Sequence, residues 1–362
     1  MSKVLLGLSG GVDSAVAAYL LKEQGHDVTC CFMRNWDSAL NNDTLGNPTL
    51  NDDICPQESD YLDAVRTAEK LGLELRRVDY ITEYWEHVFR NFVEEYGKGR
   101  TPNPDILCNK YIKFDSFLRY AMENGFDMIA TGHYARIRKD ESTGRYLLLR
   151  AKDIAKDQSY FLYMLTQDQL KHIKFPLGEY TKPKIREIAE ENDLITARKK
   201  DSQDICFVPD GDYVSFIKNY NNKTYPKGLF MHKDGFSFGE HKGIVNYTIG
   251  QRKGLGIAYK NPLYVLNIDP ETNNVILGDN EDLFTAEVTA KNVNIISGKP
   301  IIEPIRVLAR VRYRHKEQPA TAWQDENGNL HVKFDEPQRA ITKGQSLVIF
   351  DGDTVLGGGE II

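Results

Sequence analysis

The chain has 362 residues, 41% of them hydrophobic and 27% charged, the composition of a globular protein with room for about two or three domains. No apolar run approaches the roughly 18 residues of a membrane-spanning helix, and no signal peptide is recognisable, so we expect a cytoplasmic protein without a membrane partner. The five cysteines form no CxxC or CxxH pair, which argues against a disulfide scaffold, a zinc site and an iron–sulfur cluster. Because the net charge is −6, any nucleic-acid contact would need local basic groups.

In the first third of the chain, short apolar strands alternate with helices. Strands are predicted at residues 4–8, 28–33, 73–78 and 128–131, and helices at 14–24, 56–71, 83–96 and 109–123. Strands separated by helices of this length pair in parallel through right-handed crossovers, which predicts a doubly wound α/β sheet. In such sheets ligands bind at the carboxyl ends of the strands, so we expect the site in the loops that follow them.

Beyond residue 132 the predicted elements are shorter. They are a hairpin of residues 135–138 and 146–150, helical segments at 167–172 and 184–192, and strands at 263–268, 274–277, 306–314, 320–323, 330–334 and 346–350. A run of short strands commonly closes into a barrel, which buries its edges. We therefore expect an α/β domain over residues 1–208, a small, mostly β central domain over 209–284 and a C-terminal β-barrel over 285–362.

A glycine-rich turn joins the first predicted strand to the first predicted helix. It reads Gly7-Leu8-Ser9-Gly10-Gly11-Val12-Asp13-Ser14. The glycines let backbone N–H groups converge on an anion, the helix N-terminus adds a positive field, and Asp13 could hold a magnesium ion bound to phosphate. The turn lacks both the Gly-Lys-Ser/Thr of a Walker loop and the spacing of a dinucleotide fingerprint. The complete motif resembles the PP-loop pyrophosphatases, which cleave ATP between the α- and β-phosphates and transfer AMP to an oxygen.

Two of the cysteines lie in polar surroundings that suit chemistry. Cys108 follows two prolines and lies near the start of the helix predicted from residue 109, where the helix dipole favours the thiolate. Asp105 is close enough in sequence to serve as a local acid or base. Cys206 follows a basic run at the edge of the first domain, where a loop could move its thiol. A buried cysteine is usually an inert small hydrophobe, and we interpret the remaining three in this way: Cys30, Cys31 and Cys55.

Seven stretches spread over nearly the whole chain match one enzyme family. They are GLSGGVDS (7–14), TPNPDILCNKYIKF (101–114), ATGHYAR (130–136), AKDQSYFLY (155–163), DSQDICFV (201–208), YTIGQRKGLGI (247–257) and ARVRYRHK (309–316). On these motifs the chain resembles the tRNA-specific 2-thiouridylases, a branch of the PP-loop superfamily. The resemblance implies an ATP-dependent sulfurtransferase that adenylates the 2-oxygen of the wobble uridine in tRNA and replaces it with sulfur from a cysteine persulfide. The products would be 2-thiouridine, AMP and pyrophosphate.

The resemblance also implies roles for individual residues. Cys108 would be the nucleophile and Cys206 the carrier of the persulfide, the two forming a disulfide during turnover, while Asp105 would handle the proton of the target base. ATP, with Mg²⁺ on its phosphates, would be bound by residues 7–14 together with Met33 and Gly132. The implied tRNA contacts are Asn103, Pro104, Asp105, His133, Lys156, Asp157, Gln158, Arg312, Tyr313 and Gln345. A further partner would be a persulfide-donating sulfur carrier or a cysteine desulfurase, and no other metal is implied.

A basic run near the C-terminus offers local charge for RNA. Its members alternate, so on a strand they would share one face and bind phosphates: Arg310, Arg312, Arg314 and Lys316. The residues alone leave three other functions open, namely an amide-forming PP-loop ligase, a cytidine thiolase and an RNA-binding module that keeps an ATP fold. The ligase would have no use for the two cysteines together, and the cytidine thiolase would be expected to show a cluster-binding CxxC. In the RNA-binding module both cysteines would tolerate serine.

Overall fold

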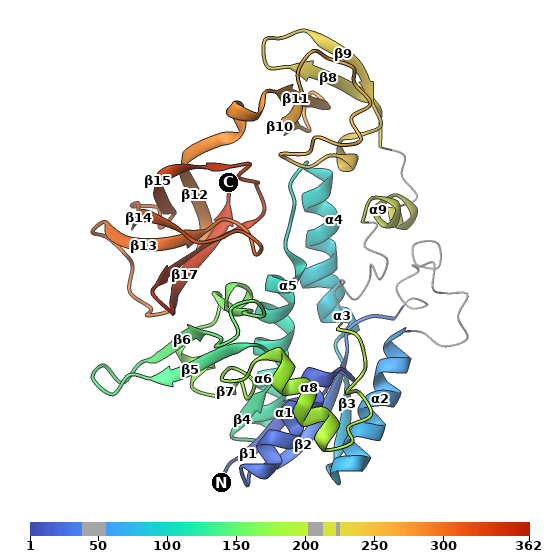
Figure 1. The fold of residues 1–362 in the computed structure, drawn as a ribbon, viewed down its shortest axis with the longest axis vertical. Helices are drawn as coiled ribbons and strands as arrows, with labels where there is room; N and C mark the ends of the chain where they lie inside the picture. Colours follow the sequence, from blue (N-terminus) through green and yellow to red (C-terminus); the bar gives the residue numbers. More distant parts are fainter. Residues whose placement is uncertain (38–55, 202–212, 222–224) are drawn as a thin grey trace.

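The structure, a computed structural model, describes residues 1–37, 56–201, 213–221 and 225–362, and the predictions on Cys55 and Cys206 lie outside these residues. The chain forms an α/β body, then a small β-sheet body, then a barrel (Figure 1). The predicted fold class is confirmed in all three parts. Within the described residues, no helix is both long enough and apolar enough to cross a membrane.

A five-stranded parallel sheet forms the centre of the α/β body, in the order β3-β2-β1-β4-β7. Its strands are β1 (Lys3–Gly7), β2 (Asp27–Arg34), β3 (Leu75–Asp79), β4 (Met128–Ala130) and β7 (Ile173–Lys174). Because side chains alternate along a strand, Leu6 and Cys30 lie in one core, whereas Leu5 and Cys31 lie in another on the opposite face. The first face is covered by α1 (Val12–Glu23), α2 (Pro56–Leu71) and α8 (Lys182–Glu191).

Two long helices cover the second face, and each contains a π-helical segment. The first comprises α3 (Ile81–Tyr84), η2 (Trp85–Phe89) and α4 (Arg90–Gly97), and the second comprises α5 (Pro104–Leu107), η3 (Cys108–Ser116) and α6 (Phe117–Glu123). The prediction that the second helix begins near residue 109 is wrong, because Asn103 is its N-cap residue and Pro104 suits its first turn. Cys108 therefore lies just past the first turn, at the start of a π-helical segment, a feature common at functional sites. Its side chain is 6% exposed and packs in the hydrophobic core of that face, which differs from the polar surroundings expected from the sequence.

A series of short elements precedes the four-stranded sheet of the central domain in the chain. After β4 come the predicted hairpin of β5 (Ala135–Lys139) and β6 (Tyr146–Arg150), then η4 (Ser159–Leu162), α7 (Gln167–Leu170), β7, α8 and α9 (Tyr213–Asn221). The four-stranded sheet of the central domain has the order β10-β11-β8-β9. Its elements are β8 (Gly228–His232), β9 (Ser237–His241), η5 (Ile244–Asn246), β10 (Tyr264–Asp269), β11 (Asn274–Gly278) and η6 (Asn280–Leu283).

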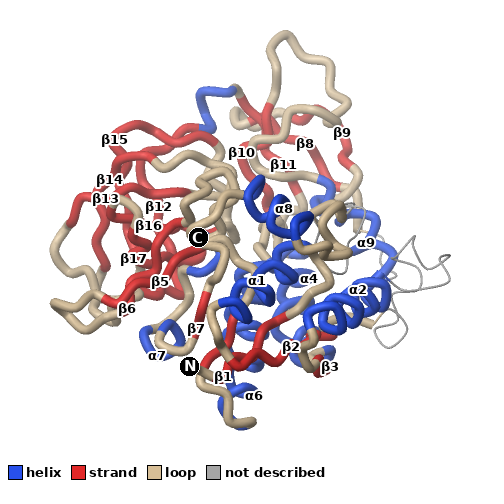
Figure 2. Tube along the Cα trace, turned by 60° about the horizontal axis from the view of Figure 1, so that its bottom comes forward, coloured by secondary structure: helices blue, strands red, loops and turns tan. Residues whose placement is uncertain are grey.

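Antiparallel strands close into the C-terminal barrel. They are β12 (Phe284–Ile295), β13 (Ile305–Arg310), β14 (Gln318–Gln324), β15 (Leu330–Arg339), β16 (Ser346–Asp351) and β17 (Thr354–Ile361). Because β12 pairs with both β15 and β17, the ring is closed. The β5–β6 hairpin continues the same sheet through the pairing of Leu149 with Thr354, and it lies alongside β17 (Figure 2). Backbone pairing therefore joins the barrel to the α/β body.

The predicted basic strand face at residues 310–316 is wrong. β13 ends at Arg310, and residues 311–315 form bends and a turn. The Arg310 side chain is buried, and its guanidinium shares the carboxylate of Glu317 with the guanidinium of Arg150 on the hairpin. The acid that follows the basic run therefore neutralises the first member of that run.

Candidate active site

The predicted phosphate loop connects β1 to α1 at the carboxyl edge of the sheet. Ser14 closes it, because its Oγ accepts a hydrogen bond from the N–H of Ser9 and donates one to the carbonyl of Gly11, each at 3.1 Å. The hydroxyl oxygens of Ser9 and Ser14 are also 3.1 Å apart. The loop thus presents the N–H groups at the start of α1 beyond the strand ends, an arrangement suited to phosphate.

Gly10 is the position where this loop most needs glycine. Its φ of +75° lies in the left-handed region, and an added Cβ would be 2.1 Å from the carbonyl oxygen of Asp60 on α2. Lys199 strengthens the contact, since its Nζ donates to the Gly10 carbonyl at 3.1 Å. The same ammonium forms ion pairs of 2.7 and 2.6 Å with the carboxylates of Asp60 and Asp63. Loop and α2 are therefore held together around Gly10.

Met33 and Gly132 both flank the loop. A Cβ on Gly7 would be 2.9 Å from Cε of Met33, so these two residues are in close contact. A Cβ on Gly132 would be 3.0 Å from the backbone nitrogen of Ser14 and 3.1 Å from the carbonyl carbon of Asp13. A larger residue at position 132 would push the end of β4 away from α1. The structure thus brings the expected ATP-binding residues together at one edge of the sheet.

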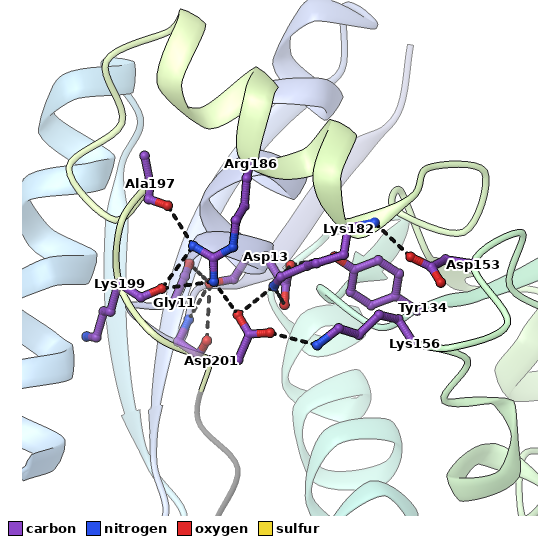
Figure 3. Close-up of polar contacts among 12 residues, drawn as sticks. Gly11, Asp13, Tyr134, Asp153, Lys156, Lys182, Arg186, Ala197, Lys199 and Asp201 are labelled. Carbon is purple, nitrogen blue, oxygen red and sulfur yellow. Dashed lines mark hydrogen bonds and ion pairs between the residues drawn. The ribbon is translucent and has the colours of Figure 1, made fainter.

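Asp13 lies in the first turn of α1, with two donors on its carboxylate. Its Oδ1 accepts a hydrogen bond from the Tyr134 hydroxyl at 2.7 Å, and its two oxygens accept from Nζ of Lys182 at 2.7 and 2.8 Å (Figure 3). Burial, followed by the negative charge of Asp13, raises the pKa of Tyr134, so the phenol stays a neutral donor. Carboxylate oxygens are preferred ligands of Mg²⁺, so Asp13 fits the ion that accompanies the phosphates of ATP.

Asp201 lies on the far side of Lys182 from Asp13. It forms an ion pair of 2.8 Å with each of Lys156, Lys182 and Arg186 (Figure 3). Burial raises the pKa of Asp201, but the hydrogen bonds from Lys156 and Lys182 outweigh this effect and lower it to about 2. Asp201 is therefore ionised at neutral pH and holds the three cations beside the phosphate loop.

Asp201 and its three cations form a cluster, and the sequence analysis missed one member of it, Lys182. The helix predicted over residues 184–192 begins earlier, because α8 starts at Lys182 with Thr181 as its N-cap residue and Pro183 in its first turn. A threonine followed by a proline near a helix start is a recognisable signal. It would have placed Lys182 at the N-terminus of α8.

The barrel holds the start of the segment that carries Asn103, Pro104, Asp105 and Cys108. The N–H of Thr101 donates to the carbonyl of Lys343 at 3.0 Å, and the side-chain amide of Gln345 donates to the carbonyl of Thr101 at 2.9 Å. Gln345 is thus placed beside the segment with which it was expected to share the tRNA. A cavity of about 570 Å³ opens between this segment and the barrel. Its lining includes Asn103, Lys110, Tyr111 and Gly344.

Asp105 reaches solvent, but protein surrounds it closely on its other sides, and this desolvation raises the pKa of its carboxyl group. Lys113 on η3, a second residue that the sequence analysis missed, lowers the pKa of Asp105 in part. Burial and then Lys113 hold the pKa of His133 well below its usual range, so the imidazole is neutral. Nδ1 of His133 is 2.7 Å from Oγ1 of Thr131, and its ring centroid is 5.6 Å from that of Phe114 on η3.

The remaining expected tRNA contacts lie on two adjoining loops. Asp157 is 2% exposed, and its Oδ1 accepts hydrogen bonds from the N–H groups of Ala151 and Ser159, so it shapes its own loop. Gln158 accepts a hydrogen bond from the N–H of Tyr134 at 2.9 Å. The loop of residues 156–158 is therefore tied to the residue whose hydroxyl reaches Asp13.

Arg312 and Tyr313 lie on the turn after β13. The guanidinium of Arg312 donates to the carbonyls of Arg339 and Ala340 at 3.0 and 3.2 Å, and burial lowers its pKa. The ring centroid of Tyr313 is 4.4 Å from that of Phe161, a few residues beyond the 156–158 loop. The fold therefore brings these two barrel residues next to the expected contacts of the α/β body.

Cys30 and Cys31 are core residues of β2. Both are fully buried, and burial raises the pKa of each thiol to about 12. Both thiols are therefore protonated at neutral pH, and their interpretation as small hydrophobes is confirmed.

Comparisons with known proteins identify the family. Residues 2–210 match a model described as the tRNA methyl transferase HUP domain, residues 214–279 one described as the tRNA methyl transferase PRC-barrel domain, and residues 285–361 one described as the aminomethyltransferase beta-barrel domain. The tRNA-specific 2-thiouridylase MnmA of Clostridioides difficile is 49% identical over 99% of this chain and 98% of its own. Those of Mycoplasma capricolum and Clostridium acetobutylicum are 46% and 48% identical, over 99% of this chain and 98% and 99% of theirs. The chain therefore belongs to the family of the tRNA-specific 2-thiouridylases MnmA.

Proposed function

We propose that this protein replaces the 2-oxygen of the wobble uridine in tRNA with sulfur, using ATP to activate the oxygen and a cysteine persulfide to deliver the sulfur. The supporting observation is that the phosphate loop and the Cys108 helix meet at the end of β4. There Gly132 abuts the start of α1, and the next residue, His133, packs against Phe114 on η3. A nucleotide on the loop and a base at Asp105 would thus be close neighbours.

The first step makes the 2-oxygen a leaving group. The uridine oxygen attacks the α-phosphorus of ATP, the bond to the α–β bridging oxygen breaks, and pyrophosphate departs, leaving AMP on the oxygen. The N–H groups of residues 10–14 would hold the phosphates, and Asp13 would bind the magnesium ion that ATP carries. Asp105 would accept the N3 proton of the base, a role supported by its raised pKa, which makes it a stronger base than an ordinary aspartate.

The second step transfers sulfur between two cysteines. The thiolate of Cys108 attacks Sγ of the Cys206 persulfide, the persulfide S–S bond breaks, and the released hydrosulfide attacks C2 of the base and displaces AMP. Cys108 and Cys206 are left as a disulfide, which an external dithiol reduces with two electrons. The role of Cys206 is supported by its motif and by the family.

The tRNA would lie across the junction of the α/β body and the barrel. The proposed contacts at Asn103, Gln158, Tyr313 and Gln345 come from both bodies and are gathered at this junction. A sulfur carrier or a cysteine desulfurase would load Cys206. We place these steps in the cytoplasm, where thiols stay reduced and the disulfide can be reopened.

One assay with matched variants tests the proposal. With ATP, tRNA and a persulfide donor, the protein should release pyrophosphate and form 2-thiouridine, identified by mass spectrometry of the digested tRNA. Cys206→Ser should still release pyrophosphate but form no 2-thiouridine, whereas Cys30→Ala, at a core cysteine, should retain both activities. Full thiolation by Cys206→Ser would refute the persulfide role, and thiolation without pyrophosphate release would refute the activation step.

A further inference from the structure

We propose that Lys182 is the phosphate-binding lysine of this site, which exchanges Asp13 for the β- and γ-phosphates of ATP and then stabilises the departing pyrophosphate. The inference deepens the proposed function and rests on it, because it requires ATP on the phosphate loop. It assigns to the positive cluster of Figure 3 a task in the first chemical step.

The position of Lys182, at a helix start and largely buried, is unfavourable for a positive charge. It is the first residue of α8, where the positive end of the helix dipole repels a cation, and its side chain is only 10% exposed. The helix start already has an acidic partner, since the N–H of Lys182 donates to Oδ2 of Asp153 at 2.8 Å. A buried ammonium that opposes both burial and the dipole is the kind of local conflict that marks functional residues.

The ammonium points at the phosphate loop. Both oxygens of Asp13 accept its hydrogen bonds, and its Nζ lies 5.9 Å from the ring centroid of Tyr134, the other donor to Asp13. Gly132 approaches Asp13 from the end of β4, so the lysine reaches the same edge where the loop presents its N–H groups. Phosphates bound by those groups would come within reach of Lys182.

The other cations of the cluster have different tasks. Lys199 binds the Gly10 carbonyl and two carboxylates of α2, and so fastens the loop from behind. Arg186 donates to the carbonyls of Ala197 and Lys199 as well as to Asp201, which ties down the chain after α8. Lys156 is 40% exposed and pairs with Asp201. Of these four cations, Lys182 is the one whose ionic partner is a side chain of the phosphate loop.

The exchange preserves charge pairing. With ATP on the loop, Asp13 would hold the magnesium ion that ATP carries and the buried Lys182 ammonium would bind phosphate oxygens, so neither charge would be left without a partner. Asp201 stays on Lys182, because Lys156 and Arg186 hold it from the other side. Two partners thus aim the ammonium before ATP arrives, which limits the reorganisation that the reaction needs.

Lys182 then acts on the leaving group. As the uridine oxygen bonds to the α-phosphorus, the bond from that phosphorus to the α–β bridging oxygen breaks, and its electron pair leaves with pyrophosphate. Negative charge therefore grows on the group that Lys182 contacts. An ammonium already in place stabilises this charge more in the transition state than in bound ATP, which raises the rate of pyrophosphate release.

Equilibrium binding of ATP, pyrophosphate and AMP to the full chain tests the assignment. Lys182→Ala should weaken ATP and pyrophosphate binding by about tenfold or more, while AMP binding, which lacks the β- and γ-phosphates, stays within about twofold. Lys182→Arg should recover part of the affinity, and Lys182→Gln, which keeps a hydrogen-bond donor without the charge, should behave like alanine. Lys184→Ala is the matched control, because Lys184 lies on the same helix in an exposed pair with Glu187.

Two results would overturn the assignment. Unchanged ATP and pyrophosphate affinity in the folded variants would remove Lys182 from the phosphates, and equal weakening of ATP and AMP would mean that it merely holds the loop in shape. The measurement uses neither tRNA nor sulfur, so its failure is separate from that of the proposed function, which would show as absence of 2-thiouridine with the wild-type chain.

Discussion

Gly10 meets two demands at once, a left-handed backbone and a neighbour that leaves no room for a Cβ. Gly10→Ala should therefore lower the free energy of unfolding by about 2–4 kcal/mol, because either the loop or the first turns of α2 must move. Gly11→Ala is the control, since Gly11 has a φ of −98° and its added Cβ would meet Ser9 Oγ at 3.6 Å. Urea denaturation of both variants measures the difference, and equal destabilisation would contradict this interpretation of the loop.

The protonation of Asp105 should determine how the reaction rate depends on pH on the acid side. If its carboxylate accepts the N3 proton, activity must fall as the pH drops through the raised pKa, so the acid limb should lie above the ordinary aspartate value of about 3.9. Asp105→Asn should remove this limb and slow pyrophosphate release by about a hundredfold. Single-turnover rates over a range of pH measure both effects.

Lys113 and Asp115 supply the comparison variants for that profile. Lys113 lowers the pKa of Asp105, so Lys113→Met should move the acid limb to higher pH. Asp115 lies on the same helix and is half exposed, with Arg119 as its ion-pair partner at 3.9 Å, so Asp115→Asn should leave the profile in place. A limb that moves with Asp115 and ignores Lys113 would exclude Asp105 as the base.

The role of residues 7–14 could be predicted because the phosphate-binding motif consists of consecutive residues. Tyr134 and Lys182 could not, since nothing in their own neighbourhood of the sequence relates them to Asp13, which they meet across 121 and 169 residues. The role of Lys113 could not be predicted either, because the π-helical segment that carries this residue alters the residue spacing expected of an α-helix. The loop was therefore predictable from the sequence, whereas the charged and polar side chains that the fold brings to it were not.

A buried ionic cluster holds the junction of the hairpin and the barrel. Glu317→Gln would leave the guanidinium groups of Arg150 and Arg310 without their shared carboxylate, although both side chains are about nine-tenths buried. We expect a loss of roughly 3 kcal/mol in the free energy of unfolding, because an uncompensated buried charge is costly. Denaturant titration of the variant measures this loss.

The matched control is an ion pair on the barrel surface. Arg306 and Asp335 form an ion pair of 2.6 Å, but both side chains are largely exposed and solvent screens them, so Asp335→Asn should destabilise the protein far less than Glu317→Gln. If Glu317→Gln is no more destabilising than Asp335→Asn, the junction does not depend on the buried cluster.

The same cluster explains where element prediction failed. Alternating charges at residues 310–316 fit the period of a strand, but the chain turns after β13 so that Glu317 can reach two arginines, one of them from another body. The helix start differs from the prediction for the opposite reason, because here the signal is local: Asn103 and Pro104 are typical of a helix N-terminus. The strand–helix alternation of residues 1–132 and four of the six barrel strands were predicted, because many residues contribute to each period, whereas β12 and β17 were not.

The barrel and the α/β body share a sheet and should unfold together. β6 pairs with β17, and Gln345 binds the backbone at Thr101, so neither body can open without disturbing the other. Tryptophans report on each: Trp36 and Trp85 lie in the α/β body and Trp323 in the barrel. In Trp323→Phe and in the double variant Trp36→Phe, Trp85→Phe, the fluorescence transitions in denaturant should coincide within each variant with the loss of circular dichroism. Two separated transitions would mean that the bodies are independent.

In the proposed reaction, ATP serves to make the uridine oxygen leave. An isotope experiment follows that oxygen: the protein is given tRNA whose wobble uridine carries a heavy oxygen isotope at C2, and the product that receives the label is determined. We expect the heavy oxygen in the phosphate group of the released AMP, at one label per 2-thiouridine formed. Label in the solvent, or AMP without label while 2-thiouridine accumulates, would contradict activation by adenylation and with it the role assigned to the phosphate loop.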